Sequence, residues 1–236
     1  LPDRRAGGVQ MTLADQGVDI LLDKMEASGL AAAEALTDFA MKHGLARFAL
    51  DEGYGPEARW EPQPVTITLG GRAVPLPFGA FLQATADGEA ALVDAVREAV
   101  GDAATVVDLF AGLGTFALAL PGKVVAVEGA RDAVLALKRT GLAVEHRDLF
   151  RRPLTRAELS RFEAVVLDPP RAGAKEQLVE LAAANVSRIA YVSCNPATFA
   201  RDAKGLVDAG WRIEWIRPVG QFRWSTHAEL AASFRR

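Results

Sequence analysis

The chain has 236 residues, of which 50% are hydrophobic, and this is enough to bury one large domain or one domain with a smaller one attached. Its single cysteine excludes an internal disulfide, and also any zinc or iron–sulfur site built from several cysteines of this chain. The formal net charge of −3 lacks the basic excess expected of a protein that binds nucleic acid unaided.

The chain carries neither an apolar run near the roughly 20 residues of a membrane span nor a charged-then-apolar leader. We therefore expect a soluble, cytoplasmic protein without a membrane partner. Because the first residue is Leu1 and not Met, we also expect that upstream sequence is missing.

The first part of the chain, residues 1–76, is expected to form a small α+β domain. Its pattern predicts two strands about a turn, then an amphipathic helix, then a hairpin with Gly70 and Gly71 at its turn. The corresponding segments are residues 7–23, 29–44 and 65–74.

The second part, residues 77–236, is expected to form a doubly wound α/β domain with a mostly parallel sheet. Short apolar runs rich in valine predict buried strands at residues 104–110, 123–129, 142–148, 163–170 and 187–194. Helical segments are expected at residues 89–101, 114–120, 131–140, 154–160, 174–184 and 196–209. Ligands of such folds bind beyond the carboxyl ends of the strands.

The first of these strands runs into a glycine loop, "DLFAGLGTFALAL", in which Gly112 and Gly114 allow a tight turn and a close approach to a ligand. Alone, the spacing also fits an NAD site or an ordinary turn. Asp108 precedes the loop, where a carboxylate suits a cationic amino-acid group and repels a pyrophosphate. Glu128 ends the second strand, where it can accept hydrogen bonds from ribose hydroxyls. Together these residues favour S-adenosyl-methionine over NAD.

Two further strands end in acidic residues. Asp148 follows the third strand and is expected to face the adenine end of the ligand. Asp168 follows the fourth in "VVLDPPRAG" and is expected to point into the cleft, with the two prolines stiffening its loop. Standing alone, Asp-Pro-Pro also fits a simple turn.

The single cysteine, Cys194, ends the fifth strand in "YVSCNPATFARD". A lone cysteine is often a small buried hydrophobe. Here Asn195 and Pro196 predict the N-cap and the first position of a helix directly after it. The helix N-terminus favours a thiolate, so the pattern predicts a nucleophile at the edge that carries the cofactor residues.

Four segments resemble the RNA (uracil-5)-methyltransferase family: "DLFAGLGTFAL", "VVAVEG", "VLDPPRAG" and above all "YVSCNPATFARD". The resemblance runs from about Phe78 to the C-terminus, and the first 75 residues match the family's central domain only loosely. It implies a Rossmann-like, class I S-adenosyl-methionine-dependent methyltransferase fold. It also implies methylation of carbon 5 of a uridine in ribosomal or transfer RNA.

The resemblance implies roles by position. Cys194 matches the nucleophile, Glu229 the general base with His227 beside it, and Gln83 a position at both cofactor and substrate. Gln83 and Asp168 are expected to read the edge of a flipped base, on which Phe81 or Phe222 stacks unless these rings only pack in the core. The expected cofactor residues are Gln83, Asp108, Phe110, Gly112, Gly114, Thr115, Glu128, Asp148 and Asp168.

The sequence departs from the family pattern at several places. Thr85 and Thr115 stand where Asn is usual, and "RWST" precedes His227 in place of Pro-His-Thr. Some members hold a four-cysteine iron–sulfur cluster, and many have an N-terminal OB-like RNA-binding domain. We expect neither in this chain, and the loss of that domain would account for the acidic charge.

Other functions stay open at this point. The glycine loop alone suits an NAD-dependent oxidoreductase, the Asp-Pro-Pro loop suits a base amino-methyltransferase, and a non-catalytic RNA-binding protein can retain a cofactor fold. Cys194 together with Glu229 argues against a non-catalytic protein, and a base amino-methyltransferase would not use Cys194. We favour ribosomal RNA over transfer RNA as the partner, and a monomer as the oligomeric state.

Overall fold

The computed structural model describes residues 7–222, 224–225 and 228–236. The chain divides into two compact units, Leu1–Thr68 with Ala73–Ala80, and Leu69–Arg72 with Phe81–Arg236. We propose that the two domains expected from the sequence correspond to these units. No helix among the described residues is long and apolar enough to span a membrane.

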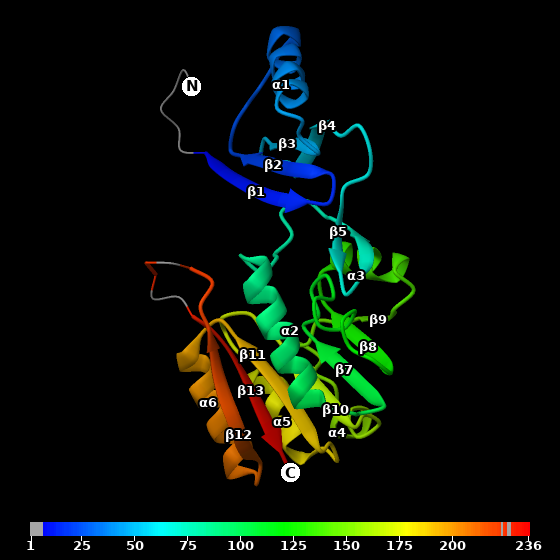
Figure 1. Cartoon of the computed structure of the whole chain (residues 1–236), viewed down its shortest axis with the longest axis vertical. Helices are drawn as coiled ribbons and strands as arrows, with labels where there is room; N and C mark the ends of the chain where they lie inside the picture. The colour runs from blue at the N-terminus through cyan, green and yellow to red at the C-terminus, as the bar shows by residue number, and fades with distance from the viewer. Residues whose placement is uncertain (1–6, 223, 226–227) are drawn as a thin grey trace. The chain divides into compact units, whose positions relative to one another are not determined.

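The first unit contains a four-stranded sheet in the order β1-β2-β3-β4 and one helix (Figure 1). The strands β1 and β2 form the predicted antiparallel pair, and α1 connects β2 to the parallel strand β3. Ile20, Phe48 and Leu50 of the sheet form a buried cluster with Ala40 of the helix. The bounds are β1 (Gly8–Ala14), β2 (Gly17–Asp23), α1 (Leu30–Lys42), β3 (Arg47–Asp51) and β4 (Pro56–Trp60).

The predicted hairpin is formed by β5 (Thr66–Leu69) and β6 (Arg72–Pro75). Gly70 and Gly71 make its turn with positive φ angles of 55° and 77°. A Cβ atom on Gly70 would lie 2.2 Å from the carbonyl oxygen of Leu118. The turn therefore requires glycine both for its backbone conformation and for this close approach.

The second unit is built on a seven-stranded sheet in the order β12-β13-β11-β10-β7-β8-β9. Its five parallel strands are those predicted: β7 (Thr105–Leu109), β8 (Lys123–Glu128), β9 (Ala143–His146), β10 (Ala164–Leu167) and β11 (Arg188–Ser193). The structure adds two antiparallel strands that were not predicted, β12 (Arg212–Val219) and β13 (Glu229–Arg235). Since β13 lies between β11 and β12, the last strand of the chain is inserted beside β11.

Helices cover both faces of this sheet (Figure 1). One face carries α2 (Ala86–Val100), which packs over β10, β11 and β13. The other carries α4 (Arg156–Leu159), α5 (Lys175–Ala183) and α6 (Pro196–Asp208), and α3 (Arg131–Arg139) packs against β8 and β9. The core beneath α4, α5 and α6 includes Leu159, Leu181, Leu206, Tyr191 and Phe234. The structure is thus an α/β fold with a mostly parallel sheet, as predicted.

The helix expected over residues 114–120 is wrong, since this segment forms a series of turns. The helix does not form because of Asp108, whose Oδ2 accepts a hydrogen bond of 3.0 Å from the backbone N–H of Ala117. That N–H is thereby diverted from the helical ladder. The segment wraps around the carboxylate instead of rising as a helix.

The loop between β10 and α5 is fixed to β11 and α6 by one buried side chain, that of Asp202. Its Oδ2 accepts hydrogen bonds from the Tyr191 hydroxyl at 2.7 Å and from the Ala174 N–H at 2.9 Å. Its Oδ1 accepts from Arg201 at 2.7 Å. Gly173 has a φ of +81°, and a Cβ atom there would lie 2.5 Å from Asp202 Oδ2. The residues after β10 are therefore held in one position.

Replacement of Asp202 by Ala is expected to lower the free energy of unfolding by about 3 kcal/mol, because each buried donor left unpaired costs about 1–3 kcal/mol. Asp208→Ala is the matched control, since Asp208 lies on the same helix, is 61% exposed and pairs with Lys204. We expect a change within about 1 kcal/mol there. Urea unfolding followed by circular dichroism measures both, and equal losses would contradict the role of Asp202.

Candidate active site at the carboxyl ends of the strands

Strand pairing brings Cys194 and Glu229 together. The antiparallel ladder between β11 and β13 pairs Ser193 with Leu230, so the residue after one strand end lies beside the first residue of the other. The parallel ladder between β10 and β11 pairs Leu167 with Tyr191, which places Asp168 at the same edge. These three predicted residues therefore meet, although they are far apart in the sequence.

Cys194 is half-buried between β11 and α6. The predicted helix start is confirmed, since Asn195 is the N-cap, its side chain accepts from the Ala197 N–H at 3.1 Å, and Pro196 follows at the first turn. The expected preference of Cys194 for the thiolate form is wrong for the chain without a bound ligand. Burial raises the pKa of the Cys194 thiol, and the negative charges of Glu229 and Asp168 raise it further. These effects outweigh the backbone hydrogen bond of Cys194 and the charge of Arg171, which lower its pKa.

Three carboxyl groups at this edge bind their protons more tightly than usual. Burial and the charge of Glu229 raise the pKa of Asp168 to about 7. Burial likewise raises the pKa of Glu229. The pKa of Asp108 is raised well above its usual range by burial and by the charges of Asp168 and Glu128. The site therefore holds more negative charge than its surroundings can solvate, which favours a cationic ligand.

The glycine loop is held by Glu128 at the end of β8. Its Oε2 accepts from the Gly112 N–H at 2.8 Å, and its Oε1 accepts from the Ala130 N–H at 2.6 Å. Each carboxylate oxygen keeps a further lone pair for a ligand hydroxyl. Gly112 has a φ of +55°, and a Cβ atom there would meet nothing within 4 Å. The bare backbone of the loop thus borders open space.

Other predicted cofactor residues lie on the loops around this space. Phe110 has a left-handed φ of 62°, a conformation that non-glycine residues hold only where the surrounding structure enforces it. Its ring lies 5.4 Å from that of Phe150, a residue that sequence reasoning missed. The exposed Asp148 accepts from the Phe150 N–H at 3.0 Å. Thr115 is half-buried after Gly114.

Asp108 differs from its neighbours because it has no exposed surface. One oxygen holds the Ala117 N–H, and the other, Oδ1, has no hydrogen-bond partner among the described residues. A buried carboxylate oxygen without a partner, on the strand that leads into the glycine loop, is compatible with a cationic ligand nearby. Asp108, Glu128 and the Gly112 backbone together fit a ligand that carries both a positive charge and hydroxyl groups.

Two of the predicted substrate residues, Phe81 and Gln83, lie at the start of the long segment Phe81–Arg236 of the second unit. The side chain of Gln83 accepts a hydrogen bond of 2.6 Å from Gln221, a residue that no sequence pattern singled out. Thr85 is the N-cap of α2. Phe81 is 76% exposed and Phe222 is 50% exposed. His227 lies outside the described residues.

Sequence reasoning also missed Arg171, although it follows directly on the Asp-Pro-Pro motif. Its carbonyl oxygen accepts from Asn195 Nδ2 at 3.0 Å and from Thr198 Oγ1 at 3.1 Å, which ties the loop to the N-terminus of α6. Its guanidinium is exposed, and its charge acts to lower the pKa of Cys194. It is the cationic counterpart to the carboxylates around the thiol.

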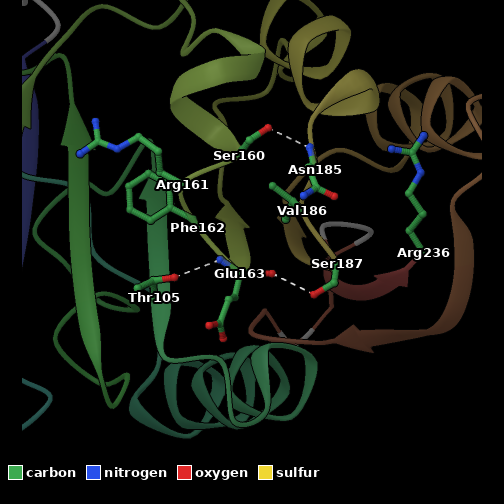
Figure 2. A pocket seen from close by; sticks show the side chains of 9 residues that line it. All are labelled: Thr105, Ser160, Arg161, Phe162, Glu163, Asn185, Val186, Ser187 and Arg236. Atoms are coloured by element: carbon green, nitrogen blue, oxygen red, sulfur yellow. Dashed lines mark hydrogen bonds between the residues drawn. The ribbon is translucent and has the colours of Figure 1, made fainter.

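A separate pocket lies at the opposite edge, where β7, β10 and β11 begin (Figure 2). Its polar groups bond to one another: Thr105 accepts from the Glu163 N–H at 3.1 Å, Ser160 from the Asn185 N–H at 2.9 Å, and Ser187 donates to the Glu163 carbonyl at 3.1 Å. These hydrogen bonds connect the loops that precede the strands. The candidate active site lies at the other edge of the sheet, where the parallel strands end.

The model of a family described as tRNA (Uracil-5-)-methyltransferase matches residues 139–236. An uncharacterized RNA methyltransferase of Zymomonas mobilis is 57% identical over 242 residues, which cover 99% of this chain and 61% of that protein. A 23S rRNA (uracil(1939)-C(5))-methyltransferase of Pseudomonas savastanoi pv. phaseolicola is 35% identical, over 84% of this chain and 47% of that protein. The chain thus spans less than two thirds of the length of these relatives.

The fold is also found in solved structures. The crystal structure of Pyrococcus abyssi tRNA (uracil-54, C5)-methyltransferase in complex with S-adenosyl-L-homocysteine superposes with a TM-score of 0.74 and 21% identity. The match covers 96% of this chain and 59% of that one. The match shows a class I S-adenosyl-methionine-dependent methyltransferase fold, as the family resemblance implied.

Alkylation of Cys194 by iodoacetamide in the free protein is expected to have its pH midpoint above about 8.5, the ordinary value for a cysteine thiol. Glu229→Gln and Asp168→Asn should each lower that midpoint, because each removes a negative charge that disfavours the thiolate. Glu98→Gln, which changes an exposed carboxylate on α2, serves as the control. A midpoint below 8.5 in the unaltered chain would contradict this electrostatic account.

Stability is expected to fall as the pH rises from about 4 to 7 because of Asp168. Its pKa in the folded chain is about 7, against about 4 when unfolded, so the folded state binds the additional proton within this window. Asp168→Asn removes that contribution. Thermal unfolding at pH 5 and pH 8 should therefore show a smaller drop in Tm for Asp168→Asn than for the unaltered chain. An equal drop in Tm for the variant and the unaltered chain would argue against a raised pKa of Asp168.

Proposed function

We propose that this chain, which belongs to the RNA (uracil-5)-methyltransferase family, transfers a methyl group from S-adenosyl-methionine to carbon 5 of a uridine in RNA. The observation that carries the proposal is the meeting of Cys194, Glu229 and Asp168 at the edge that also bears the glycine loop. Carbon 5 of uracil is a poor nucleophile, so its methylation needs a covalent catalyst and a separate base. A cysteine beside a carboxylate supplies both.

The donor site that we propose uses the loops after β7, β8 and β9. S-adenosyl-methionine, when bound, supplies an electrophilic methyl group on a positively charged sulfur. Glu128 is proposed to accept from its ribose hydroxyls, Phe110 and Asp148 to lie at its adenine end, and the backbone of Gly112 to line its path. The remaining proposed donor residues are Gln83, Asp108, Gly114, Thr115 and Asp168. The raised pKa values of Asp108 and Asp168 support a cationic ligand beside them.

The residues of the chain then act on the uracil ring. The thiolate of Cys194 forms a bond to carbon 6, and the electrons of the ring double bond move onto carbon 5 and its neighbouring carbonyl. Carbon 5 would then bond the methyl group as the bond from that group to the donor sulfur breaks, and S-adenosyl-homocysteine would be the leaving group. Glu229 removes the proton from carbon 5, the ring double bond re-forms, and the bond from carbon 6 to sulfur breaks to return the thiolate. The raised pKa of Glu229 suits a group that must hold this proton.

The target base must leave its stack before Cys194 can reach carbon 6, which costs a few kcal/mol and least in a loop or single strand. We propose that Gln83 and Asp168 hydrogen-bond the edge of that base, and that Phe81 stacks on it. The exposure of the Phe81 ring supports a contact with a ligand more than a place in the core.

Ribosomal RNA is the target that we favour. The name of the Pseudomonas relative supports this choice, whereas the family model and the Pyrococcus structure carry names that refer to transfer RNA. Transcripts of both RNA classes, incubated with the chain and a labelled methyl donor, separate the two. Because the relatives are longer than this chain, the complete protein of such a relative serves as the positive control.

The covalent mechanism predicts a stalled adduct on RNA that contains 5-fluorouridine. Fluorine at carbon 5 is not removed as a proton, so the bond from Cys194 to carbon 6 should persist after methyl transfer. A denaturing gel should show one protein–RNA band, which Cys194→Ala abolishes. Glu229→Gln should accumulate the same band on ordinary uridine and lower the methylation rate by about 100-fold or more.

The control for this experiment is Ser187→Ala, which changes a residue at the opposite edge of the sheet. This variant should form the adduct as the unaltered chain does. Methyl transfer by Cys194→Ala at the normal rate would overturn the nucleophile assignment. Release of product by Glu229→Gln at the normal rate would place the base elsewhere.

A further inference from the structure

Gln221 connects two segments that lie far apart in the sequence. It is 8% exposed and follows β12, in the segment that leads to Glu229 at the start of β13. Its Oε1 accepts hydrogen bonds from the backbone N–H groups of Ala84 at 2.8 Å and Thr85 at 3.3 Å. Its Nε2 donates to Oε1 of Gln83 at 2.6 Å.

The orientation of both amide groups follows from the backbone. Backbone N–H groups are donors only, so the end of the Gln221 amide that faces Ala84 and Thr85 must be its oxygen. The other end, its NH₂ group, then faces Gln83, and only the oxygen of Gln83 can accept from it. Exchange of the oxygen and nitrogen positions in either amide would place donor against donor. The Gln83 amide therefore has one orientation, although amides are ambiguous when they stand alone.

The side chain of Gln221 packs closely against the start of α2. Gly88 in the first turn of α2 lies against it, and a Cβ atom there would be 2.6 Å from the Gln221 Cγ atom. Thr85 caps this helix by accepting from the Gly88 N–H at 3.2 Å. The helix N-terminus, the segment that carries Gln83 and the segment that leads to β13 are thus joined at one side chain.

We infer that Gln221 is a positioning residue that fixes the Gln83 amide so that its NH₂ group is the end free to meet the target base, and that this orientation selects uracil over cytosine. This inference rests on the proposed function. With its oxygen held by Gln221, the Gln83 side chain offers its NH₂ group, which makes no other hydrogen bond among the described residues. Uracil presents a carbonyl acceptor at carbon 4, whereas cytosine presents an amino donor there. A fixed donor pairs with the first and leaves the second unpaired.

Gln221→Glu tests this assignment with little change of shape. The new carboxylate can still accept from Ala84 and Thr85, but it cannot donate to Gln83. The Gln83 amide should then turn, donate to that carboxylate and present its oxygen to the base. We expect the ratio of covalent adduct on 5-fluorouridine RNA to that on 5-fluorocytidine RNA to fall by about 10- to 100-fold, since an unpaired polar contact costs about 1–3 kcal/mol.

Three further variants make the test specific. Gln83→Ala should lower the same ratio, and the double variant Gln83→Ala with Gln221→Glu should lower it no further, because Gln221 acts through Gln83. Gln10→Glu, an exposed residue of β1, controls for the added charge and should keep the original ratio. The probes are transcripts of 23S ribosomal RNA and of transfer RNA, each made with either fluorinated pyrimidine.

The outcomes separate this inference from the proposed function. An unchanged ratio in a folded Gln221→Glu variant would overturn the inference and leave the proposed function standing. Absence of any adduct with the unaltered chain and with its longer relative would remove the proposed function, and the selection of uracil with it. Thermal unfolding of Gln83→Ala, Gln221→Ala and their double variant tests the hydrogen bond between the two side chains and does not depend on enzymatic activity. Losses of Tm that simply add would show that the two amides are not coupled.

Discussion

Repulsion among buried carboxylates is the constraint on which the candidate active site depends. Asp168 lies close enough to Glu229 and Asp108 to perturb or be perturbed by each, and Cys194 experiences the same charges. Burial removes the water that would screen them. The free chain accommodates this by holding protons on groups that would ordinarily release them. A cation bound at this edge relieves the same repulsion, so the affinity for a positively charged donor and the state of the thiol are physically linked.

The site tolerates this repulsion because its loops are rigidly held. The loops are held by side chains that accept hydrogen bonds from backbone N–H groups of distant segments. These are Asp202 from Ala174, Glu128 from Gly112 and Gln221 from Ala84. Each fixes a loop that has no regular structure of its own. Such contacts hold groups in defined positions, which matters because a misplacement of about 1 Å can slow a reaction by about 100-fold. They also define orientation, as the single arrangement of the Gln83 and Gln221 amides illustrates.

The last two strands explain how a carboxylate and a cysteine from different elements meet. A purely parallel sheet would place every strand end, and no strand start, at the edge that binds ligands. Because β13 runs antiparallel beside β11, its first residue, Glu229, lies at that edge. The reversal of one strand therefore supplies a second functional group next to Cys194 without another loop.

The sequence by itself determined what depends on neighbours along the chain. The valine-rich runs specified the five parallel strands, the glycines specified the loop after β7, and Asn195 with Pro196 specified the helix that follows Cys194. Local periodicity and capping act within a few residues, and they leave direct traces in the sequence.

The tertiary structure alone decided what depends on distant residues. It inserted β13 between β11 and β12, diverted the Ala117 N–H to Asp108 in place of a helix, and raised the pKa of Cys194 where its local position suggested the opposite. It also brought Gln221 to Gln83. Strand order, burial and the charges around a group arise from contacts between segments far apart in the chain. No local pattern encodes them, because the free energy that fixes them exists only once those segments have packed together.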